Sequence, residues 1–259
     1  MLFSSELFNI LTLNNCCCIL WFIELSRKAG VYMSKVYSVV VAFILVYAIL
    51  PNIYFRLFSH QVLKRAATKK KIVALTFDDG PDPRYTPELL NVLRKNNVKC
   101  TFFVLAENAL KYPELIKSIK DDGHYIGLHS LRHINAIVES PKKTRNTFLK
   151  SISIMEKLGV KITLFRPPWG MVNLSTMFYT RTNHFKPILW STHSYDWIGW
   201  NTVENIKSLL LKRIRPGDIV LLHDGRGKNN APKRTIAALE TVIPKLKKEG
   251  YEFVLVKDL

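Results

Sequence analysis

The chain has 259 residues, which suffices for one large domain or two small ones. With 48% hydrophobic and 22% charged residues, it has the composition of a globular protein that carries an extra apolar segment. Its formal net charge of +18 suits anionic polymers or acidic lipid surfaces. The sequence has no zinc-finger spacing, RNA-binding signature or Gly-rich phosphate loop, so we do not expect nucleic acid as a partner. A merely solvated basic surface is the alternative, because the lysines are spread over many predicted helices.

The four cysteines do not form a disulfide framework. Cys16, Cys17 and Cys18 are contiguous, and Cys100 stands alone within an apolar strand pattern. Neither a sensible pairing nor a CxxC metal motif results. We therefore expect Cys100 to be a small buried core residue.

Residues 33–56 are predicted to form a transmembrane anchor or a signal segment. The stretch Val36–Phe55 carries no charge, and about 20 apolar residues are needed to cross a bilayer. Pro51 and Asn52 weaken its end, but no small-x-small cleavage site follows, which favours an uncleaved anchor. Residues 57–70 are then expected to be a basic linker.

Two questions about the N-terminal region stay open at this point. More positive charge follows the apolar stretch than precedes it, and the positive-inside rule alone would place the following domain in the cytoplasm. Met33-Ser34-Lys35 before an apolar run resembles a natural protein start. We hypothesise that Met33 is the initiator, and we treat residues 1–32 as an uncertain N-terminal extension.

From residue 70 onward, strand-like and helix-like segments alternate. The predicted strands are Ile72–Phe77, Cys100–Leu105, Tyr125–Leu128, Ile162–Phe165, Pro187–Trp190, Ile219–Leu222 and Phe253–Val256. The predicted helices are Glu88–Lys95, Pro113–Asp122, Lys142–Leu158, Thr202–Arg213 and Thr235–Glu249. Repeating βα units imply a parallel sheet, either open or closed into a barrel.

Polar residues gather where the predicted strands end. They are Asp78 and Asp79 after the first strand, His129 and His133 after the third, Arg166 after the fourth, Asp196 past the fifth and His223 at the end of the sixth. The carboxyl ends of parallel strands meet at one face, where barrel enzymes place their chemistry. The pattern therefore predicts a catalytic site.

The adjacent aspartates and the two histidines suit a metal. Side chains of neighbours at a strand end diverge, so one acid of Asp78-Asp79 can hold a metal while the other handles a proton. His129 and His133 have HxxxH spacing, and two imidazoles with one carboxylate suit Zn²⁺. A bound metal would polarise a carbonyl and activate water. The alternative for the aspartates is a turn that caps the next helix.

Arg166 and His223 suit supporting roles. The guanidinium of Arg166 can fix one aspartate and keep it ionised. His223 can donate a proton to a leaving amine if a carboxylate holds its other nitrogen, and Asp196 is the candidate. A surface turn and a buried structural histidine are the alternatives for these two residues taken singly.

Five motifs in order resemble those of the polysaccharide deacetylases. They are TFDDGP at 76–81, HSLRH at 129–133, RPPWG at 166–170, YDW at 195–197 and LLHD at 221–224. This is carbohydrate esterase family four, the nodulation-type chitooligosaccharide deacetylase domain. The resemblance runs from about Lys71 to the C-terminus. It implies that residues 71–259 form a catalytic domain, an α/β fold built as an irregular (β/α) barrel of about seven strands.

The resemblance also implies roles for individual residues. Asp79, His129 and His133 would bind a divalent metal, with Zn²⁺ favoured over Co²⁺, Ni²⁺ and Mn²⁺. Asp78 would be the general base, oriented by Arg166, and His223 would be the general acid, supported by Asp196. The backbone N–H of Trp169 would help to hold the oxyanion. Further substrate contacts are assigned to Pro168, Trp169, Gly170, Trp197 and Leu221.

The sequence departs from the family pattern at three places. His193 stands where many relatives carry an acid, and we interpret it as a loop residue. Trp169 replaces a common Tyr, which should preserve the stacking surface. The basic stretch Arg226–Lys233 could contact an anionic substrate, although a solvated loop is favoured.

The resulting expectation is a metal-dependent N-deacetylase of an N-acetylglucosamine polymer, with peptidoglycan favoured. We expect a single-pass protein of the cell membrane with a monomeric extracellular catalytic domain, or a secreted one if the segment is cleaved. The alternatives are a chitin or chitooligosaccharide deacetylase, a hydrolase of small cyclic amides, and a wall-binding protein without turnover.

Overall fold

The computed structural model describes Glu24, Arg27 and residues 33–259 of the chain. The extension predicted for residues 1–32 thus lies outside the described residues, apart from Glu24 and Arg27. The chain divides into two compact units, Met1–Tyr47 and Ala48–Leu259, and the sheet belongs to the second.

A long apolar helix, Met33–Phe58, has the length and composition to cross a membrane. Its 26 residues correspond to about 39 Å at 1.5 Å per residue, more than the roughly 30 Å of a hydrocarbon core. A signal segment near the N-terminus has the same properties, so the helix fits either prediction. Its last part is wound as η1 (Leu45–Ile49), α2 (Leu50–Ile53) and η2 (Tyr54–Phe58).

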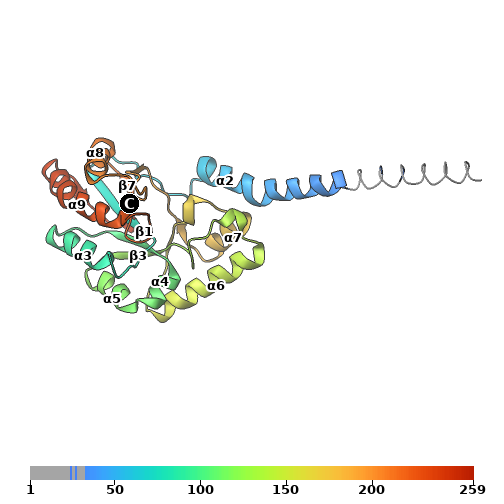
Figure 1. The fold of residues 1–259 in the computed structure, drawn as a ribbon, viewed down its shortest axis with the longest axis horizontal. Helices are drawn as coiled ribbons and strands as arrows, with labels where there is room; N and C mark the ends of the chain where they lie inside the picture. The colour runs from blue at the N-terminus through green and yellow to red at the C-terminus, as the bar shows by residue number, and fades with distance from the viewer. Residues whose placement is uncertain (1–23, 25–26, 28–32) are drawn as a thin grey trace, which may run out of the picture. The chain divides into compact units, whose positions relative to one another are not determined.

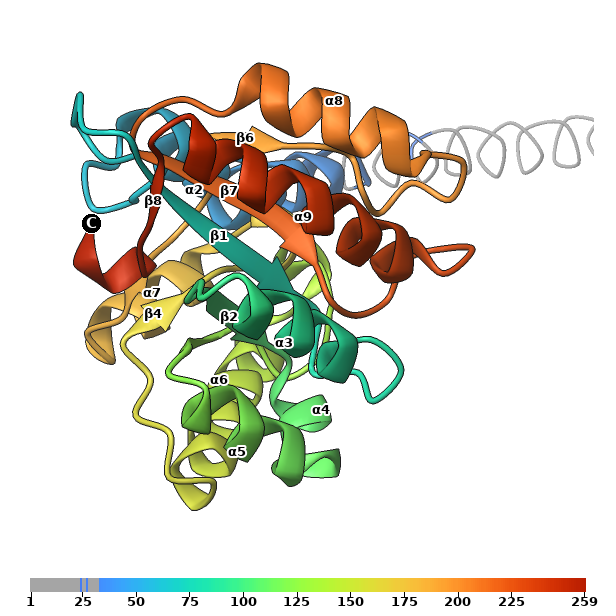
Figure 2. The same cartoon turned by 90° about the vertical axis from the view of Figure 1, so that its left-hand side faces the viewer.

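Eight parallel strands form one curled sheet in the unit Ala48–Leu259 (Figures 1 and 2). They are β1 (Ile72–Asp78), β2 (Thr101–Val104), β3 (Tyr125–Leu128), β4 (Leu164–Phe165), β5 (Lys186–Pro187), β6 (Thr192–His193), β7 (Asp218–His223) and β8 (Glu252–Phe253). Seven of them follow the order β5-β4-β3-β2-β1-β7-β6, and β8 pairs with the start of β1. The predicted α/β fold with about seven parallel strands is confirmed.

The two edges of this sheet lie close to each other. The predicted fifth strand, Pro187–Trp190, is wrong as drawn, because β5 ends at Pro187 on one edge and β6 begins at Thr192 on the other. Only residues 188–191 connect them, and so few residues span at most about 17 Å. The sheet must therefore curl into a nearly closed barrel.

The segment before β1 fills the seam between these edges. The N–H of Leu63 donates to Pro187 O at 3.0 Å, and the N–H of Leu189 donates back to Leu63 O at 2.9 Å. On the other side, Arg65 pairs with the buried carboxylate of Asp218 at 2.6 Å. Part of the stretch predicted to be a linker is thus hydrogen bonded to the sheet.

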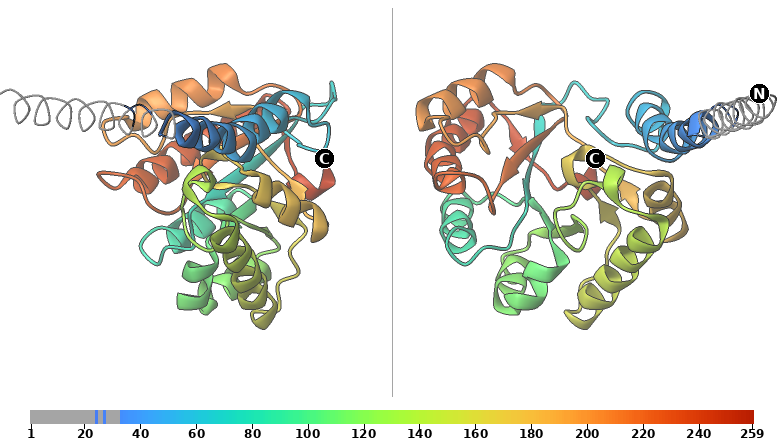
Figure 3. Two further views of the ribbon diagram at one scale, coloured as in Figure 1. Left: turned by 90° about the vertical axis from the view of Figure 1, so that its right-hand side faces the viewer. Right: turned by 45° about the vertical axis from the view of Figure 1, so that its right-hand side comes forward.

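Besides α2, seven helices within Ala48–Leu259 surround the sheet on its outside (Figure 3). They are α3 (Thr86–Lys95), α4 (Ala106–Lys111), α5 (Pro113–Asp121), α6 (Pro141–Lys157), α7 (Leu174–Thr182), α8 (Val203–Arg213) and α9 (Ala231–Lys248). Side-chain caps begin three of them, as when Ser140 accepts from the N–H of Lys143. The prediction missed α4 and α7, and α9 begins four residues before the predicted Thr235.

The alternation of β1 separates the core into two layers. Val73, Leu75 and Phe77 point outward into the main core beneath the helices, while Ala74 points into the barrel interior. Because side chains alternate along a strand, Thr76 and Asp78 share the inward direction of Ala74. The strand thereby aims Asp78 along the barrel axis at its carboxyl end.

Candidate active site

The carboxylate of Asp78 is fixed by a buried arginine. Arg166 Nη1 lies 2.7 Å from Asp78 Oδ1 and donates at the same distance to the hydroxyl of Thr76. Arg166 Nη2 donates to Leu189 O at 3.1 Å, and the guanidinium stacks over the Phe103 ring at 4.1 Å. The Arg166 side chain is 0% exposed and that of Asp78 is 4% exposed, so this ion pair is shielded from water.

Three potential metal ligands converge beside this pair. Ligand atoms of Asp79, His129 and His133 all lie within 4.8 Å of one another. Asp79 Oδ1 is 3.4 Å from His133 Nε2 and 3.6 Å from His129 Nε2. It is buried and has no hydrogen-bond donor among the described residues. Two imidazoles and one carboxylate suit Zn²⁺, so the residues present fit a metal.

The chemical state of these groups favours metal binding. His129 Nδ1 lies 2.7 Å from Arg166 O, and a carbonyl only accepts, so Nδ1 carries the proton and Nε2 faces the site with its lone pair. Burial, with His129 and Arg226 nearby, lowers the pKa of His133 to about 3, which keeps it neutral. Burial raises the pKa of Asp79, and the neighbouring histidines oppose that effect.

His223 and Asp196 form a second pair across the site. His223 is the register partner of Asp78 on the adjacent strand, so both stand at the same level of the sheet. Its Nδ1 lies 3.1 Å from Asp196 Oδ1, and Asp196 Oδ2 accepts from the His223 N–H and the Thr235 hydroxyl. Burial alone would lower the pKa of His223, but the charge of Asp196 and its hydrogen bond raise it to about 9.

The sequence analysis gave no role to Asp224, whose carboxylate lies against Gly80, the residue after Asp79. Asp224 Oδ2 accepts from the Thr86 hydroxyl at 2.6 Å. Burial raises its pKa to about 7. A Cβ on Gly80 would lie 2.3 Å from Asp224 Oδ2, so glycine is required there by close approach. The position of Asp224 directly after His223 was the only available signal.

The predicted substrate contacts divide into exposed and buried residues. Trp169 is 58% exposed, and its ring centroid lies 5.0 Å from that of His133. Trp197 packs edge-on against His223 at 5.3 Å. Pro168 and Gly170 are buried in the same loop, and Leu221 is buried on β7 as the register partner of Thr76. Both tryptophans therefore flank the histidines.

Two further residues differ from their sequence interpretation. His193 lies in β6 and not in a loop, with its ring 4.2 Å from that of Tyr195. Arg226, the first residue of the basic stretch, has a half-exposed side chain, and its Nε lies 3.5 Å from Asp79 Oδ2. The basic stretch thus begins at the site itself.

Backbone strain concentrates around the same face. Five non-glycine residues near the site have positive φ values, namely Asp79, Ser130, Trp169, Tyr195 and Arg226. Each such conformation costs about 1–3 kcal/mol and persists only where its surroundings impose it. Strained residues collect at functional sites, which agrees with the placement of the polar groups.

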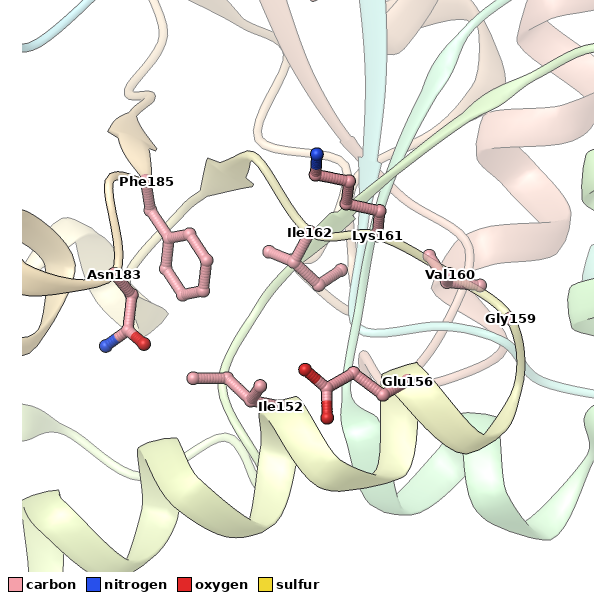
Figure 4. Close-up of a pocket in the computed structure, with 8 residues that line it drawn as sticks. All are labelled: Ile152, Glu156, Gly159, Val160, Lys161, Ile162, Asn183 and Phe185. Atoms are coloured by element: carbon pink, nitrogen blue, oxygen red, sulfur yellow. The ribbon is translucent and has the colours of Figure 1, made fainter.

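A pocket of 460 Å³ lies beside the amino ends of β4 and β5 (Figure 4). Ile152 of α6, Ile162 and Phe185 converge there, between α6 and the chain that enters β4 and β5. It holds none of the predicted site residues. The amino ends of barrel strands generally serve stability, so we do not place the chemistry there.

Comparison with known proteins shows the family of the chain. The family model for polysaccharide deacetylase matches residues 65–188. A peptidoglycan-N-acetylglucosamine deacetylase of Bacillus cereus is 40% identical over 192 residues, covering 73% of this chain and 88% of the relative. A chitooligosaccharide deacetylase of Azorhizobium caulinodans is 29% identical and covers 72% of this chain and 93% of its own.

Solved structures agree as well. The crystal structure of a peptidoglycan N-acetylglucosamine deacetylase in complex with 4-naphthalen-1-yl-N-oxidanyl-benzamide has a TM-score of 0.71. It is 34% identical to this chain and covers 76% of it and 92% of its own length. The chain therefore belongs to the polysaccharide deacetylase family.

Proposed function

We propose that this protein is a metal-dependent hydrolase that removes N-acetyl groups from N-acetylglucosamine units of a cell-wall polysaccharide, releasing acetate. The observation that carries the proposal is the convergence of three groups at one end of the barrel. They are the Asp79, His129 and His133 ligand set, the Asp78–Arg166 pair and the His223–Asp196 pair.

Asp79, His129 and His133 would hold the metal, and we assign Zn²⁺ because its preferred ligands are nitrogen and carboxylate oxygen. When bound, the metal supplies Lewis-acid polarisation of the acetyl carbonyl and lowers the pKa of water. Arg166 holds the Asp78 carboxylate in place at 2.7 Å, so Asp78 is the base that takes a proton from the attacking water. The N–H of Trp169 stabilises the negative charge that develops on the carbonyl oxygen.

His223 then supplies the proton that the leaving amine requires. Its Nδ1 proton is held by Asp196 at 3.1 Å, which leaves Nε2 to face the reacting group. With its pKa raised to about 9, His223 is protonated at neutral pH. Acid and base thus come from adjacent strands, β7 and β1.

Peptidoglycan is the substrate we assign, on three grounds. A relative named as a peptidoglycan-N-acetylglucosamine deacetylase is 40% identical to the chain. A net charge of +18 suits an anionic wall. The helix Met33–Phe58 would hold the enzyme at the membrane beneath that wall. Chitooligosaccharides are the second candidate, because a relative with that name matches 72% of the chain.

Acetate release from N-acetylated peptidoglycan and from chitotetraose, each with added zinc or with chelator, tests the proposal. We expect zinc-dependent release with a higher kcat/KM on peptidoglycan. Preference for chitotetraose would shift the substrate assignment, and no release from either glycan by zinc-loaded protein would refute the function.

A further inference from the structure

The end of the apolar helix, Ala48–Phe58, belongs to the same compact unit as the barrel. Its residues divide by face. Those that are buried are Ala48, Pro51, Asn52 and Phe55, and those that are exposed are Ile49, Leu50, Ile53, Tyr54, Leu57 and Phe58. This spacing is that of a helix with one side against protein.

Asn52 pairs with the backbone of the Trp169 loop. Its side-chain oxygen accepts from the N–H of Val172 at 2.9 Å, and its amide nitrogen donates to Val172 O and to Ala48 O. One buried side chain therefore satisfies both backbone groups of Val172. A polar residue inside an otherwise apolar helix has here a specific partner 120 residues away in the chain.

Arg56 binds the backbone of Trp169 and Gly170 in the same loop. Its Nη2 donates to Trp169 O at 3.1 Å and to Gly170 O at 2.9 Å. Both residues have left-handed backbones, with φ of 60° at Trp169 and 63° at Gly170. For a tryptophan this conformation persists only if the surroundings impose it. A Cβ on Gly170 would come within 3.0 Å of the same guanidinium nitrogen.

Apolar packing supports the same contact. Phe55 forms a buried cluster with Val62, Val172 and Leu189. On the side of the active site, the Trp169 ring lies against His133. The loop thus lies between the helix end and the predicted metal ligands.

We propose that Asn52 and Arg56 are positioning residues that hold the Trp169 loop in its active conformation, so that the end of the apolar helix is part of the catalytic apparatus. The inference rests on the proposed function, because that function assigns the Trp169 N–H to the developing oxyanion. Small displacements of such donors cost large factors in rate. Residues that lie outside the family match at 65–188 then contribute to turnover.

The test uses the full chain in detergent micelles, as Arg56→Met, Asn52→Ala and the control Leu57→Ala. Leu57 lies on the same helix and is 73% exposed, so it leaves the loop untouched. Three quantities are measured: hydrogen exchange of the peptide covering residues 168–172, zinc affinity, and kcat and KM on chitotetraose. Hydrogen exchange reports the loop whether or not the protein is an active deacetylase.

We expect faster exchange at Val172 in both variants and a kcat lowered about 10- to 100-fold, with zinc affinity and KM within about threefold of wild type. The control should match wild type. Exchange and kcat that equal those of Leu57→Ala would overturn the inference, as would a lowered kcat without altered exchange in the loop. Should Arg56→Met fail to fold, the same comparison is made with Asn52→Ala. A wild-type protein without turnover but with the predicted exchange pattern would refute only the proposed function.

Discussion

Replacing Arg166 by methionine should destabilise the protein strongly. The guanidinium is fully buried and lies 2.7 Å from Asp78, whose side chain is 4% exposed. Methionine has a similar length but no charge, so the carboxylate would remain buried without its partner. Breaking such a pair costs about 3–5 kcal/mol. For a domain of this size, that corresponds to a decrease in melting temperature of roughly 6–20 °C.

The expected loss of stability in Arg166→Met comes from the buried charge of Asp78, which no longer has a partner. A second substitution, which removes that charge, isolates this cause. In Arg166→Met/Asp78→Asn the carboxylate charge is removed as well, so the double variant should be more stable than Arg166→Met alone by about 1 kcal/mol or more. Arg94→Met is the matched control, because Arg94 pairs with Asp122 at 2.9 Å on the surface, and its loss should leave the unfolding midpoint nearly unchanged.

Urea unfolding of the four proteins in chelator, followed by circular dichroism, gives these free energies. Chelator removes any contribution of bound metal to stability. A loss below about 1 kcal/mol for Arg166→Met would refute the assignment of a buried ion pair, and so would a double variant that is no more stable than Arg166→Met.

Three further predictions concern pH and packing. Asp196→Asn should lower the pKa of His223 from about 9. The alkaline limb of the kcat–pH profile should then move to lower pH by about one unit or more. A limb that does not move would exclude His223 as the general acid. Burial raises the pKa of Asp224 from 3.8 to about 7. The stability that protonated Asp224 contributes is therefore present at low pH and is lost as the pH rises from about 4 to about 7. Urea midpoints at pH 5 and pH 8 should differ less in Asp224→Asn than in wild type. Gly80→Ala should cost about 1–3 kcal/mol, because its methyl would lie 2.3 Å from Asp224 Oδ2, and thermal unfolding without a decrease would contradict the close approach.

The gathering of the candidate site residues on one face could be predicted from the sequence, because parallel strands end on one side. Asp78, Asp79, His129, Arg166 and His223 each follow an apolar run that is a true strand, so the strand-end argument places them together without any knowledge of long-range contacts. The register of β1 with β7 then sets Asp78 opposite His223.

The parts that were missed depend on tertiary contacts. The apolar run Pro187–Trp190 was predicted to be one strand, yet Pro187 ends β5 and Thr192 begins β6, at opposite edges of the sheet. The helix α4 has six residues, too short for a periodic pattern, and α7 is rich in β-branched threonine. Tertiary packing outweighs local propensity at both places.

Asn52 and Arg56 were hidden for a different reason. An apolar stretch near the N-terminus is typical of a membrane segment. The sequence analysis therefore interpreted Asn52 only as a residue that weakens the end of this segment. The partner of Asn52, Val172, lies 120 residues further along the chain, and no local sequence pattern predicts this contact. A polar residue within a predicted membrane segment is a functional hypothesis by default.

The most direct measurement for the central claim is a zinc titration of the metal-free protein, with metal content and acetate release followed in parallel. If Asp79, His129 and His133 hold the required metal, acetate release should rise with bound zinc and level off at about one zinc per chain, and His133→Ala should neither retain zinc nor release acetate. Acetate release by the metal-free protein, or undiminished release by His133→Ala, would contradict the account.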